Sequence, residues 1–543
     1  MPPGGTTSTE AGRDAPGLDA EVLIVGAGPV GCWLAAELCA AGVRVLLIEA
    51  RETRAAFPRG FVVHPLTLEI LDSRGIAQRL VQAGRRLPTW HFAMGSRRLD
   101  FTALPTAFPF VLIQPQAHTE ALLEEHLNRH GGSVSRGRRV VGLTQHADHV
   151  AVRVLRDGAE HTLTASFVVG CDGARSAVRE GAGIGFGGSP DTMVSPHTLV
   201  ELADPPPPEQ YMQTRENGVF FAIALPHGRF VISTVDHAMM NDVETPWTAE
   251  MVRASLIRIT GTDYGMGVPE RVSTLGNSAK QAHRYRDRRV LLAGDAAHVH
   301  YPMGGQGMNL GIQDAHNLAW RLTAAVRAER DRPGSADLPD ALLDGYEAER
   351  RPVGERVLED VRAQMALVAA AGADGTALRS RFEALLSEHP EVNLEYALRL
   401  SGLQVRYPQA GDEGESGDGG DPRLGARIPD LLLDLSAGDD GSGAEPADGG
   451  TRLYELLSDI GPARFVRVSV SGEGAAAAGS ADKSDESDEQ VVHIAARSVL
   501  GPDWARRAGW GRAETVLIRP DGHVAELGGA TASPLGTANG GRP

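Results

Sequence analysis

Cysteine is scarce in this chain, and its few positions exclude several kinds of site. The sequence of 543 residues contains only three cysteines, Cys32, Cys39 and Cys171. They form no C-x-x-C pair and no metal-ligand spacing, so neither disulfides nor a zinc site are expected. Because no cysteine follows Cys171, the C-terminal half of the chain cannot carry out dithiol chemistry.

Long apolar runs are missing as well. No stretch of about 18 apolar residues occurs, so a membrane-spanning helix is not expected. Residues 1–19 are polar, rich in Gly, Pro and Thr, and without the apolar segment of a signal peptide. The sequence therefore predicts a disordered tail at the N-terminus and a cytoplasmic protein.

Lysine is nearly absent, and acidic residues outnumber basic ones. Lys280 and Lys483 are the only lysines, and the formal net charge is −17. Nucleic-acid binding needs a basic surface that releases counterions, so nucleic acid is not expected as a partner. The remaining composition is typical of globular proteins, and the length predicts roughly two to four domains.

A glycine motif near the N-terminus lies between two predicted strands. Residues 21–26 (EVLIVG) are typical of a buried strand, GAGPVG at 26–31 opens a helix, and a second strand at 43–48 ends at Glu49. This is the G-x-G-x-x-G fingerprint in the strand, helix and strand context that it requires. In this context the motif is a strong signal for a bound dinucleotide.

The residues of this motif have separate physical roles. Gly26 permits the tight turn, Gly28 lets a pyrophosphate touch the backbone, and Gly31 lets the helix pack closely on the strand. The helix N-terminus favours the phosphates by about 0.3–1 kcal/mol. Glu49 can accept hydrogen bonds from an adenosine ribose and would repel a 2′-phosphate, so the motif favours FAD or NAD over NADP.

A second glycine-rich stretch, GDAAHVHYPMGGQGMN at 294–309, follows a short apolar strand and precedes a helix. Its glycines let the backbone approach a flat ring or a phosphate, and Asp295 can accept hydrogen bonds from sugar hydroxyls. The alternative is an ordinary glycine-rich turn. His298 and His300 could also form a metal pair, but the sequence places no third ligand, so no metal is predicted.

The middle of the chain separates these motifs. Strand-like runs between 191 and 275 predict a mainly β segment, inserted before the strand at 289–293. The glycine run at 181–188 has no strand before it and is interpreted as a loop. One helix is expected at 341–350, and a second is expected to start at Pro352.

The C-terminal part alternates between strand candidates and acidic, Gly-rich segments. These segments predict a linker and two disordered loops, at 410–421, 436–450 and 471–490. The strand candidates lie at 465–470, 491–495, 515–518 and 523–525. Because a Pro-Asp-Gly turn joins the last two, this part is predicted to be a small α/β domain with a terminal hairpin.

Three motifs occur in one order along the chain: GAGPVG with Glu49, CDGARS at 171–176, and the stretch at 294–309. Together they resemble the single-component FAD-dependent aromatic hydroxylases of the para-hydroxybenzoate and phenol hydroxylase type, and especially the polyketide hydroxylases of actinomycete antibiotic pathways. The resemblance runs from about Glu21 to Leu400. Leu66 departs from it, because the family usually has Arg there.

The resemblance extends to the C-terminal part. SGLQVRYP at 401–408, LGARIPDL at 424–431 and VLIRPDGHV at 516–524 are similar to the thioredoxin-like C-terminal domain of that family. Without cysteine this domain would have a structural role. The hairpin departs from the family at Glu526, where an aromatic residue is common.

The resemblance implies which residues bind FAD. They are Gly26, Gly28, Val30, Gly31, Glu49, Arg59, Gln116, Asp172, Gly294, Asp295, Pro302, Gly305, Gly307, Met308 and Asn309. Arg59 would lie along the pyrophosphate, Gln116 near the flavin end and Asp295 on the ribityl chain, while Pro302 and 304–309 would run along the flavin ring. Asp172 belongs to a pair implicated in handling both FAD and NAD(P)H.

The implied fold class is α/β, with a Rossmann-type FAD-binding domain, an inserted mainly β substrate domain and a C-terminal thioredoxin-like domain. The predicted boundaries are a disordered tail at 1–19, the FAD-binding domain at 20–190 and 276–408, the substrate-binding domain at 191–275, a linker at 409–422, the thioredoxin-like domain with disordered insertions at 423–530 and a second tail at 531–543.

The activity implied by the resemblance is that of a monooxygenase. NAD(P)H would bind transiently and reduce FAD, and O2 would then form a flavin C4a-hydroperoxide that hydroxylates a polycyclic aromatic polyketide in antibiotic biosynthesis. No catalytic residue is assigned, although His298 or His300 could assist phenol deprotonation. The implied partners are the small-molecule polyketide and O2, with neither nucleic acid nor a membrane, and the protein would be a monomer or a homodimer.

Other functions stay open at this point. Baeyer–Villiger oxygen insertion uses the same cofactor, and a non-catalytic flavin-binding or drug-binding protein would keep the fold without turnover. An NAD-dependent dehydrogenase would leave the stretch at 294–309 unexplained, and a flavin halogenase is disfavoured because no WxWxIP motif occurs. Candidate pocket residues are His91, Tyr211, Phe220, Tyr301 and Met303, although such residues more often belong to the core.

Overall fold

The computed structural model describes residues 18–54, 60–331, 340–408, 421–435, 450–470, 490–496, 498–501, 510 and 514–528. The predicted tails, the linker and the two predicted disordered loops lie almost entirely outside these residues, and Arg59 lies outside them too. Among the described residues, no helix is long and apolar enough to cross a membrane.

The largest sheet has a parallel centre in the order β20-β11-β1-β2-β8, with β19 at one edge and β10 and β9 continuing from β11. Its strands are β1 (Ala20–Val25), β2 (Val45–Ile48), β8 (Val134–Ser135), β9 (Arg139–Gln145), β10 (Val150–Arg156), β11 (Ala159–Gly170), β19 (Arg286–Asp287) and β20 (Val290–Leu292). β1 lies between β2 and β11, where Val22 pairs with both Val45 and Phe167. Its complete burial explains the apolar run at 22–25, because a central parallel strand is covered on both faces.

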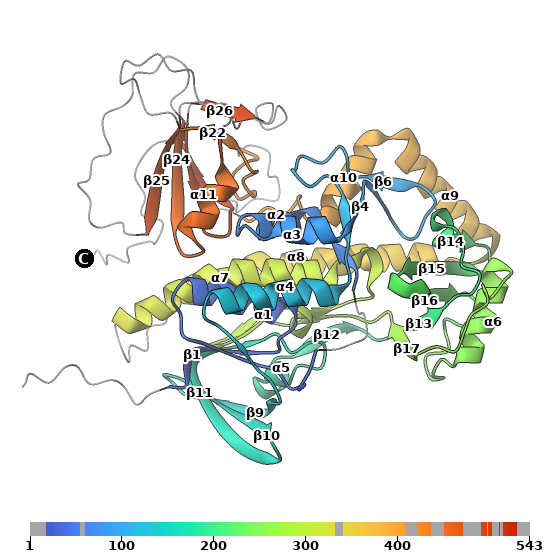
Figure 1. Ribbon diagram of the computed structural model, residues 1–543, viewed down its shortest axis with the longest axis horizontal. Helices are drawn as coiled ribbons and strands as arrows, with labels where there is room; N and C mark the ends of the chain where they lie inside the picture. The colour runs from blue at the N-terminus through green and yellow to red at the C-terminus, as the bar shows by residue number, and fades with distance from the viewer. Residues whose placement is uncertain are drawn as a thin grey trace, which may run out of the picture.

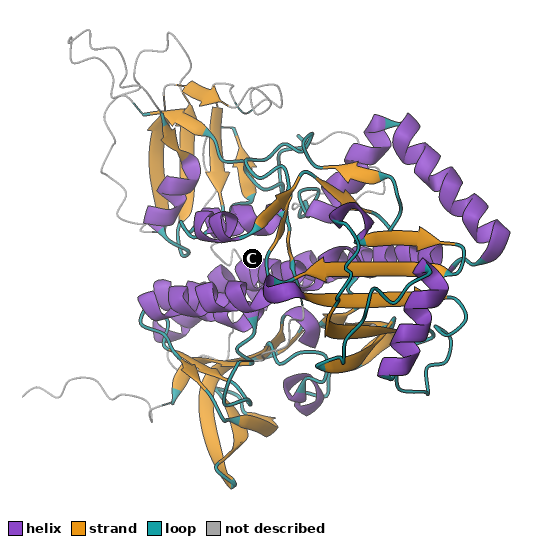
Figure 2. Ribbon diagram, turned by 45° about the vertical axis from the view of Figure 1, so that its right-hand side comes forward, coloured by secondary structure: helices purple, strands orange, loops and turns teal. Residues whose placement is uncertain are grey.

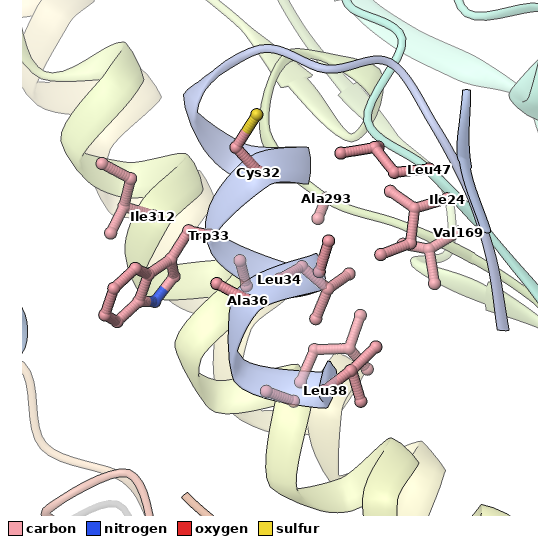
Figure 3. Close-up of a cluster of buried hydrophobic side chains, with 14 of the residues drawn as sticks. Ile24, Cys32, Trp33, Leu34, Ala36, Leu38, Leu47, Val169, Ala293 and Ile312 are labelled. Atoms are coloured by element: carbon pink, nitrogen blue, oxygen red, sulfur yellow. The ribbon is translucent and has the colours of Figure 1, made fainter. Parts of the chain in front are cut away.

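Helices cover this sheet and form the main core with it. They are α1 (Pro29–Ala40), α4 (Gln116–Arg129), α7 (Gly307–Asp331) and α8 (Asp340–Ala369). Figure 3 shows α1 between the sheet residues Ile24, Leu47 and Val169 on one side and Ile312 of α7 on the other. Trp33 and Leu34 of α1 are fully buried there, so the helix that follows the first glycine motif is held on both sides.

Helix α8 corrects one prediction from the sequence. Two helices were expected, at 341–350 and from Pro352, but the structure has one continuous helix with Pro352 inside it. The helix continues because residues before the proline are anchored to the nucleotide-binding region: Tyr346 Oη donates to Leu292 O at 2.7 Å, and Arg350 is fully buried. These contacts outweigh the one backbone hydrogen bond that proline removes. Figure 1 shows α7 and α8 running side by side through the middle of the molecule.

The segment between 191 and 275 forms an antiparallel sheet in the order β14-β15-β16-β13-β17. Its elements are β13 (Val194–Glu201), β14 (Met212–Arg215), β15 (Gly218–Ala224), β16 (Arg229–Asp236), β17 (Arg271–Gly276) and helix α6 (Ala249–Thr260). Phe220 and Ala222 share a core cluster with Val252 and Leu256 of α6. Because side chains alternate along a strand, the neighbours of Phe220 on β15 lie on the other face of the sheet.

Shorter elements lie between and around these two sheets. They are β3 (Val62–Val63), α2 (Pro65–Asp72), α3 (Ala77–Ala83), β4 (Arg85–Leu87), β5 (Thr89–His91), β6 (Arg98–Asp100), β7 (Val111–Ile113), α5 (Ala177–Gly181), α9 (Gly372–Glu388) and α10 (Pro390–Ser401). β4 and β3 both pair with β7, and β5 pairs with β6 as a hairpin.

A small sheet also corrects the loop predicted at 181–188. β12 (Phe186–Ser189) pairs with β18 (Ala279–Ala282), which pairs in turn with β21 (His298–Val299). The end of the glycine run is therefore a strand. Its backbone comes close to that of β18, since a Cβ at Gly188 would lie 2.1 Å from Ala279 O.

The C-terminal part contains two further sheets, seen in orange at the upper left of Figure 2. One has the order β23-β22-β26, and the other has the order β25-β24-β27-β28. The elements are β22 (Leu432–Asp434), β23 (Thr451–Arg452), α11 (Leu453–Ile460), β24 (Phe465–Val470), β25 (Val491–Ala496), β26 (Ser498–Gly501), β27 (Glu514–Ile518) and β28 (Val524–Leu527). The predicted strands are confirmed, and β27 and β28 form the predicted terminal hairpin.

Buried charged groups dock this C-terminal part onto the rest of the chain. Arg519 forms an ion pair with Glu349 of α8 at 2.7 Å, and Arg427 forms one with Glu69 of α2 at 3.4 Å. Asp521 accepts hydrogen bonds from the side chain of Trp320 on α7 at 3.3 Å. Burial would raise the pKa of Asp521, but the nearby Arg519 outweighs it and holds that pKa well below its usual range. The interface therefore depends on paired charges as well as on apolar contact.

Candidate active site

A cavity of about 810 Å³ lies where strands β1, β11 and β20 of the large sheet end. Ligands of open α/β sheets bind outside the carboxyl ends of the strands, so this is the expected place for a nucleotide. Val25, Cys171 and Asp295 line it, one from the end of each strand or the loop that follows. The predicted residues that line it are Gly26, Gly28, Val30, Glu49, Gln116, Asp172, Asp295, Pro302, Gly305, Gly307 and Met308.

The glycines of the first motif meet different surroundings. A Cβ at Gly26, whose φ is +102°, would lie 2.4 Å from Cys171 O, and a Cβ at Gly31 would lie 2.0 Å from Gly26 O. Both positions therefore require glycine for the packing of β1, α1 and the loop after β11. At Gly28 no described residue lies within 4 Å of the added carbon. This open position leaves backbone accessible at the N-terminus of α1, where a helix favours an anion.

Glu49 is held at the rim of the same cavity by two backbone groups. Ala27 N donates to Oε2 at 3.0 Å, and Arg51 N donates to Oε1 at 2.9 Å. These bonds tie the end of β2 to the first glycine motif. They fix the carboxylate where an adenosine ribose would meet it in a dinucleotide-binding fold.

Asn309 and Gly294, which were predicted to contact the ligand, do not line the cavity. The side chain of Asn309 donates to Val62 O at 2.9 Å and to Gly305 O at 2.8 Å, and it accepts from His64 N at 2.8 Å. Asn309 therefore holds the loop of residues 302–308 against β3. Gly294 has a φ of +63° and is buried, and its N–H donates to Asp314 at 3.1 Å.

Asp314 is the centre of a buried charged cluster that the sequence did not predict. Its carboxylate accepts hydrogen bonds from His298 Nε2 at 2.6 Å and from Arg350 Nε at 2.8 Å. Burial alone would raise the pKa of Asp314, but His298 and Arg350 outweigh it and lower that pKa. The only sequence signal was an acidic residue inside an apolar helical run. His298 is thereby occupied and lines neither cavity, which removes it as a base for the substrate.

Arg179 links the CDGARS segment to the second glycine-rich stretch. Its guanidinium donates to Ala296 O at 3.0 Å and to Ala174 O at 2.9 Å. Asp172, which lines the cavity, accepts from Ser176 and from Val178 N. Burial raises the pKa of Asp172. All three motifs are thus joined around one cavity.

A second cavity of about 950 Å³ lies against the antiparallel sheet. Val219, Phe221 and Ile223 line it from β15, the face opposite to Phe220. Of the candidate pocket residues, His91, Tyr301 and Met303 line it. Tyr211 and Phe220 do not, and the prediction for these two is wrong. The register of β15 turns Phe220 into the core beneath α6, and Tyr211 packs against the same core cluster.

The two cavities share a wall. Phe61, Val62, Pro302 and Gly305 line both of them. Gly304 O, in the same loop, accepts hydrogen bonds from His64 Nε2 at 2.9 Å and from Trp90 Nε1 at 3.3 Å. The second glycine-rich stretch is therefore fixed as the boundary between the two cavities, of which the second is the more apolar.

Comparison with known proteins identifies this arrangement. A family model described as an FAD binding domain matches residues 19–361. A protein of Bacillus subtilis (strain 168), named as an uncharacterized aromatic compound monooxygenase, YhjG, is 39% identical over 509 residues, which are 93% of each chain. The chain belongs to the FAD-binding aromatic hydroxylase family. This hydroxylase is thus an FAD-dependent monooxygenase by family.

Other relatives of the hydroxylase come from antibiotic producers. The anhydrotetracycline monooxygenase of Streptomyces rimosus is 35% identical over 526 residues, covering 93% of this chain and 94% of that protein. The structure of OxyS anhydrotetracycline hydroxylase from Streptomyces rimosus matches with a TM-score of 0.78 at 34% identity, covering 96% of this chain and 97% of that one. The hydroxylase therefore has the mixed α/β fold of that FAD-binding group, and it is related to polyketide hydroxylases.

Proposed function

We propose that this hydroxylase inserts one oxygen atom into a polycyclic aromatic polyketide of an antibiotic pathway. NAD(P)H supplies two electrons, and the second atom of O2 leaves as water. The observation that carries the proposal is the wall shared by two cavities of unlike chemistry, at Phe61, Val62, Pro302 and Gly305. Because the same residues line both cavities, a cofactor bound in the first would lie next to an apolar substrate bound in the second.

The first cavity has the features that FAD needs. The open position at Gly28 admits a pyrophosphate against the backbone, and Glu49 accepts from the adenosine ribose. Asp295, exposed at the cavity, accepts from the ribityl hydroxyls. Pro302, Gly305, Gly307 and Met308, in the loop of residues 302–308, would hold the flat ring. When bound, FAD accepts a hydride from NAD(P)H and activates O2, chemistry that no side chain supplies.

Some of the predicted residues shape the site without lining the cavity, and one, Arg59, lies outside the described residues. Gly31 packs α1 on β1, while Gly294 and Asn309 shape the loop that holds the ring. Val30 contacts Gly294 from the first motif, since a Cβ at Gly294 would lie 2.9 Å from it. Arg59 stays assigned to the pyrophosphate on the sequence resemblance alone. Asp172 and Gln116 line the rim and complete the proposed FAD site.

The second cavity binds the substrate in this proposal. Its walls from β15 are apolar, which suits a fused aromatic ring system. They also keep water away from the reacting carbon, so that oxygen is transferred to the ring instead of being released as peroxide. The protein binds the ring at the shared wall, and the volume of about 950 Å³ suits several fused rings better than one.

The domain boundaries belong to the same proposal. The nucleotide-binding domain comprises 20–190 and 276–408, and the substrate domain comprises 191–275. Residues 423–530 form a thioredoxin-like domain, which is supported by the parallel pairing of β24 with β25 and the antiparallel pairing of β24 with β27. Its contacts with α2, α7 and α8 support a structural role.

The test is turnover by purified protein. We expect bound FAD, oxidation of NADH or NADPH that a polycyclic phenol accelerates, and one atom from ¹⁸O2 in the product. Protein that stays colourless after FAD reconstitution would contradict the proposal. Bound FAD without substrate-stimulated turnover would favour a flavin-binding or drug-binding protein, and a lactone product would indicate Baeyer–Villiger insertion. Initial rates with NADH and NADPH compared side by side identify the reductant.

A further inference from the structure

His91 stands out among the residues of the second cavity because its surroundings are strained. It ends strand β5, lines the cavity and is 2% exposed. Two and three positions after His91, Ala93 and Met94 have φ angles of +49° and +57°, which non-glycine residues rarely adopt. Such conformations cost about 1–3 kcal/mol each and cluster at functional sites.

Specific hydrogen bonds hold this strained turn. Ala93 N donates to Gln364 Oε1 on α8 at 3.1 Å, and Gly95 N donates to Phe92 O at 2.9 Å. The turn places Met94 N so that it donates to His91 Nδ1 at 3.3 Å. Since Nδ1 accepts, it carries the lone pair, and the proton of the neutral imidazole is on Nε2.

The imidazole stays neutral in the folded protein. Burial, with Arg98 and His64 close by, lowers the pKa of His91 to about 3. Nε2 therefore carries its proton and acts as an N–H donor at neutral pH. Within the described part of the chain, no protein group hydrogen-bonds to Nε2. Although His91 is 2% exposed, its Nε2 is not among the fully buried atoms that lack a partner, so this nitrogen reaches the open space of the cavity, where water or a ligand is its partner.

We propose that His91 is a substrate-binding residue, whose Nε2–H donates a hydrogen bond to a carbonyl or phenolate oxygen of the aromatic substrate. This inference rests on the proposed function of the second cavity. The substrate class is narrowed to fused aromatic rings that carry an accepting oxygen on the edge facing β5. A ring system without that oxygen would leave the donor unpaired, which costs affinity.

The same bond favours an ionised phenol over a neutral one. A hydrogen bond to a charged oxygen is about twice as strong as one to a neutral oxygen. Arg98, on the paired strand β6, adds positive charge near His91. His91 would therefore lower the pKa of a bound phenol and supply the electron-rich form of the ring. The proton of the phenol is released to solvent, and His91 keeps the proton on Nε2.

The experiment measures binding, with 2-naphthol as the probe and naphthalene as its oxygen-free control. Equilibrium dialysis is performed on FAD-loaded wild type, on His91→Phe, which removes the donor, and on His91→Gln, whose amide can replace Nε2–H. We expect the wild type to prefer 2-naphthol. We expect His91→Phe to lose about 10-fold in 2-naphthol affinity and to bind naphthalene as before, while His91→Gln keeps the preference.

A spectroscopic readout separates this role from a merely structural one. The absorbance of bound 2-naphthol reports its ionisation, and its pKa should rise by about one unit in His91→Phe, the same 10-fold change. Far-ultraviolet circular dichroism and FAD content show whether each variant is folded. If His91→Phe is not folded, the comparison of His91→Gln with His91→Asn, whose shorter amide does not reach the Nε2 position, gives the same test.

Two results would overturn the inference. One is a wild type without preference for 2-naphthol over naphthalene, and the other is a folded donor-free variant that keeps the preference and the ionisation. Because binding is measured without NAD(P)H, the proposed function fails separately. If no oxygenated product forms but the preference depends on His91, only the turnover proposal fails. If product forms and His91→Phe changes nothing, only the inference about His91 fails.

Discussion

The two cavities differ in how the chain builds them. The first is made largely by short motifs at strand ends, which contribute glycines and carboxylates at fixed spacing to its wall. The second takes its wall from one face of β15, from the β5 turn and from the shared loop, which are distant in sequence. The difference corresponds to two tasks: local sequence motifs form the cofactor site, and tertiary packing of distant segments forms the substrate site.

Removing Asp314 should have the largest effect and should affect the first cavity. Asp314→Ala leaves Arg350 buried and unpaired, and breaking a buried ion pair costs about 3–5 kcal/mol. The free energy of unfolding, measured with urea, should fall by that amount, and FAD retention should fall with it because Gly294 loses its anchor.

The double variant Asp314→Ala with Arg350→Met is the control. It removes both charges, so it should recover part of the lost stability. If the single and double variants unfold at the same urea concentration, the cluster does not stabilise the protein in the way described.

Gly31 and Gly28 differ in what a methyl group would meet. Alanine normally stabilises a helix relative to glycine by about 1 kcal/mol. Gly31→Ala should instead destabilise the protein by about 3 kcal/mol, because its Cβ would lie 2.0 Å from the backbone oxygen of Gly26. Urea unfolding without added FAD measures this, and an unchanged or higher midpoint would contradict it.

Gly28→Ala is the matched variant. Since no residue in the described part of the chain lies within 4 Å of its Cβ, stability should change by less than about 0.5 kcal/mol. The methyl group would occupy the proposed pyrophosphate position, so the Kd of FAD should rise by about 10-fold or more, as measured by fluorescence titration. Unchanged FAD affinity would refute the role of Gly28.

Acid should lower the free energy of unfolding through His91, which lines the second cavity. His91 has a pKa of about 3 when folded, against an ordinary value of 6.5. Below pH 6.5 the unfolded chain takes up a proton that the folded chain does not, so stability falls with pH, by about 2 kcal/mol for this group between pH 7 and 5.

Urea unfolding of wild type and His91→Phe at pH 7 and pH 5 isolates this group. His64, His126 and His316, whose pKa values are also lowered by burial, remain in both proteins and cancel in the difference. The variant should lose about 2 kcal/mol less than the wild type on acidification. Equal losses would show that His91 is protonated in the folded protein.

Phe221→Ala should have the smallest effect on the protein and should act only on the second cavity. Phe221 is partly exposed and lines that cavity from β15. Losing part of the aromatic wall should weaken naphthalene binding about fivefold through lost apolar contact. FAD content should stay at the wild-type level. A loss of FAD would show that the two cavities do not bind cofactor and substrate independently.

The sequence predicted the first cavity far better than the second. The pattern of strand, glycine motif, helix and acidic residue has a physical meaning within about 30 residues, so Gly26, Gly28 and Glu49 could be placed directly. In the second cavity, the sequence predicted Phe220 as a pocket residue, but Phe221 lines the cavity instead. Which face of β15 lines the cavity depends on which face packs against α6, and the local sequence does not determine that. Asp314 and Arg350 are 36 positions apart, and nothing local connects them.

Helix α8 shows the same limit in secondary structure. Pro352 ordinarily marks a helix start or end, and the local rule predicted a boundary there. The buried contacts of Tyr346 and Arg350 decide otherwise. The predicted strands of the C-terminal part were placed well, since their apolar runs and the Pro-Asp-Gly turn are local signals.

The buried charges beneath the C-terminal part have a consequence for synthesis of the chain. Glu69 and Glu349 emerge from the ribosome long before Arg427 and Arg519, which pair with them. Until the last hundred or so residues are made, Glu69 and Glu349 lack these two arginines, although Glu349 keeps its ion pair with Arg321 at 2.8 Å. The surface of α7 and α8 that the C-terminal part covers stays exposed to chaperones and proteases during that time. An early stop or frameshift would therefore leave this charged surface uncovered, which favours degradation of the truncated chain.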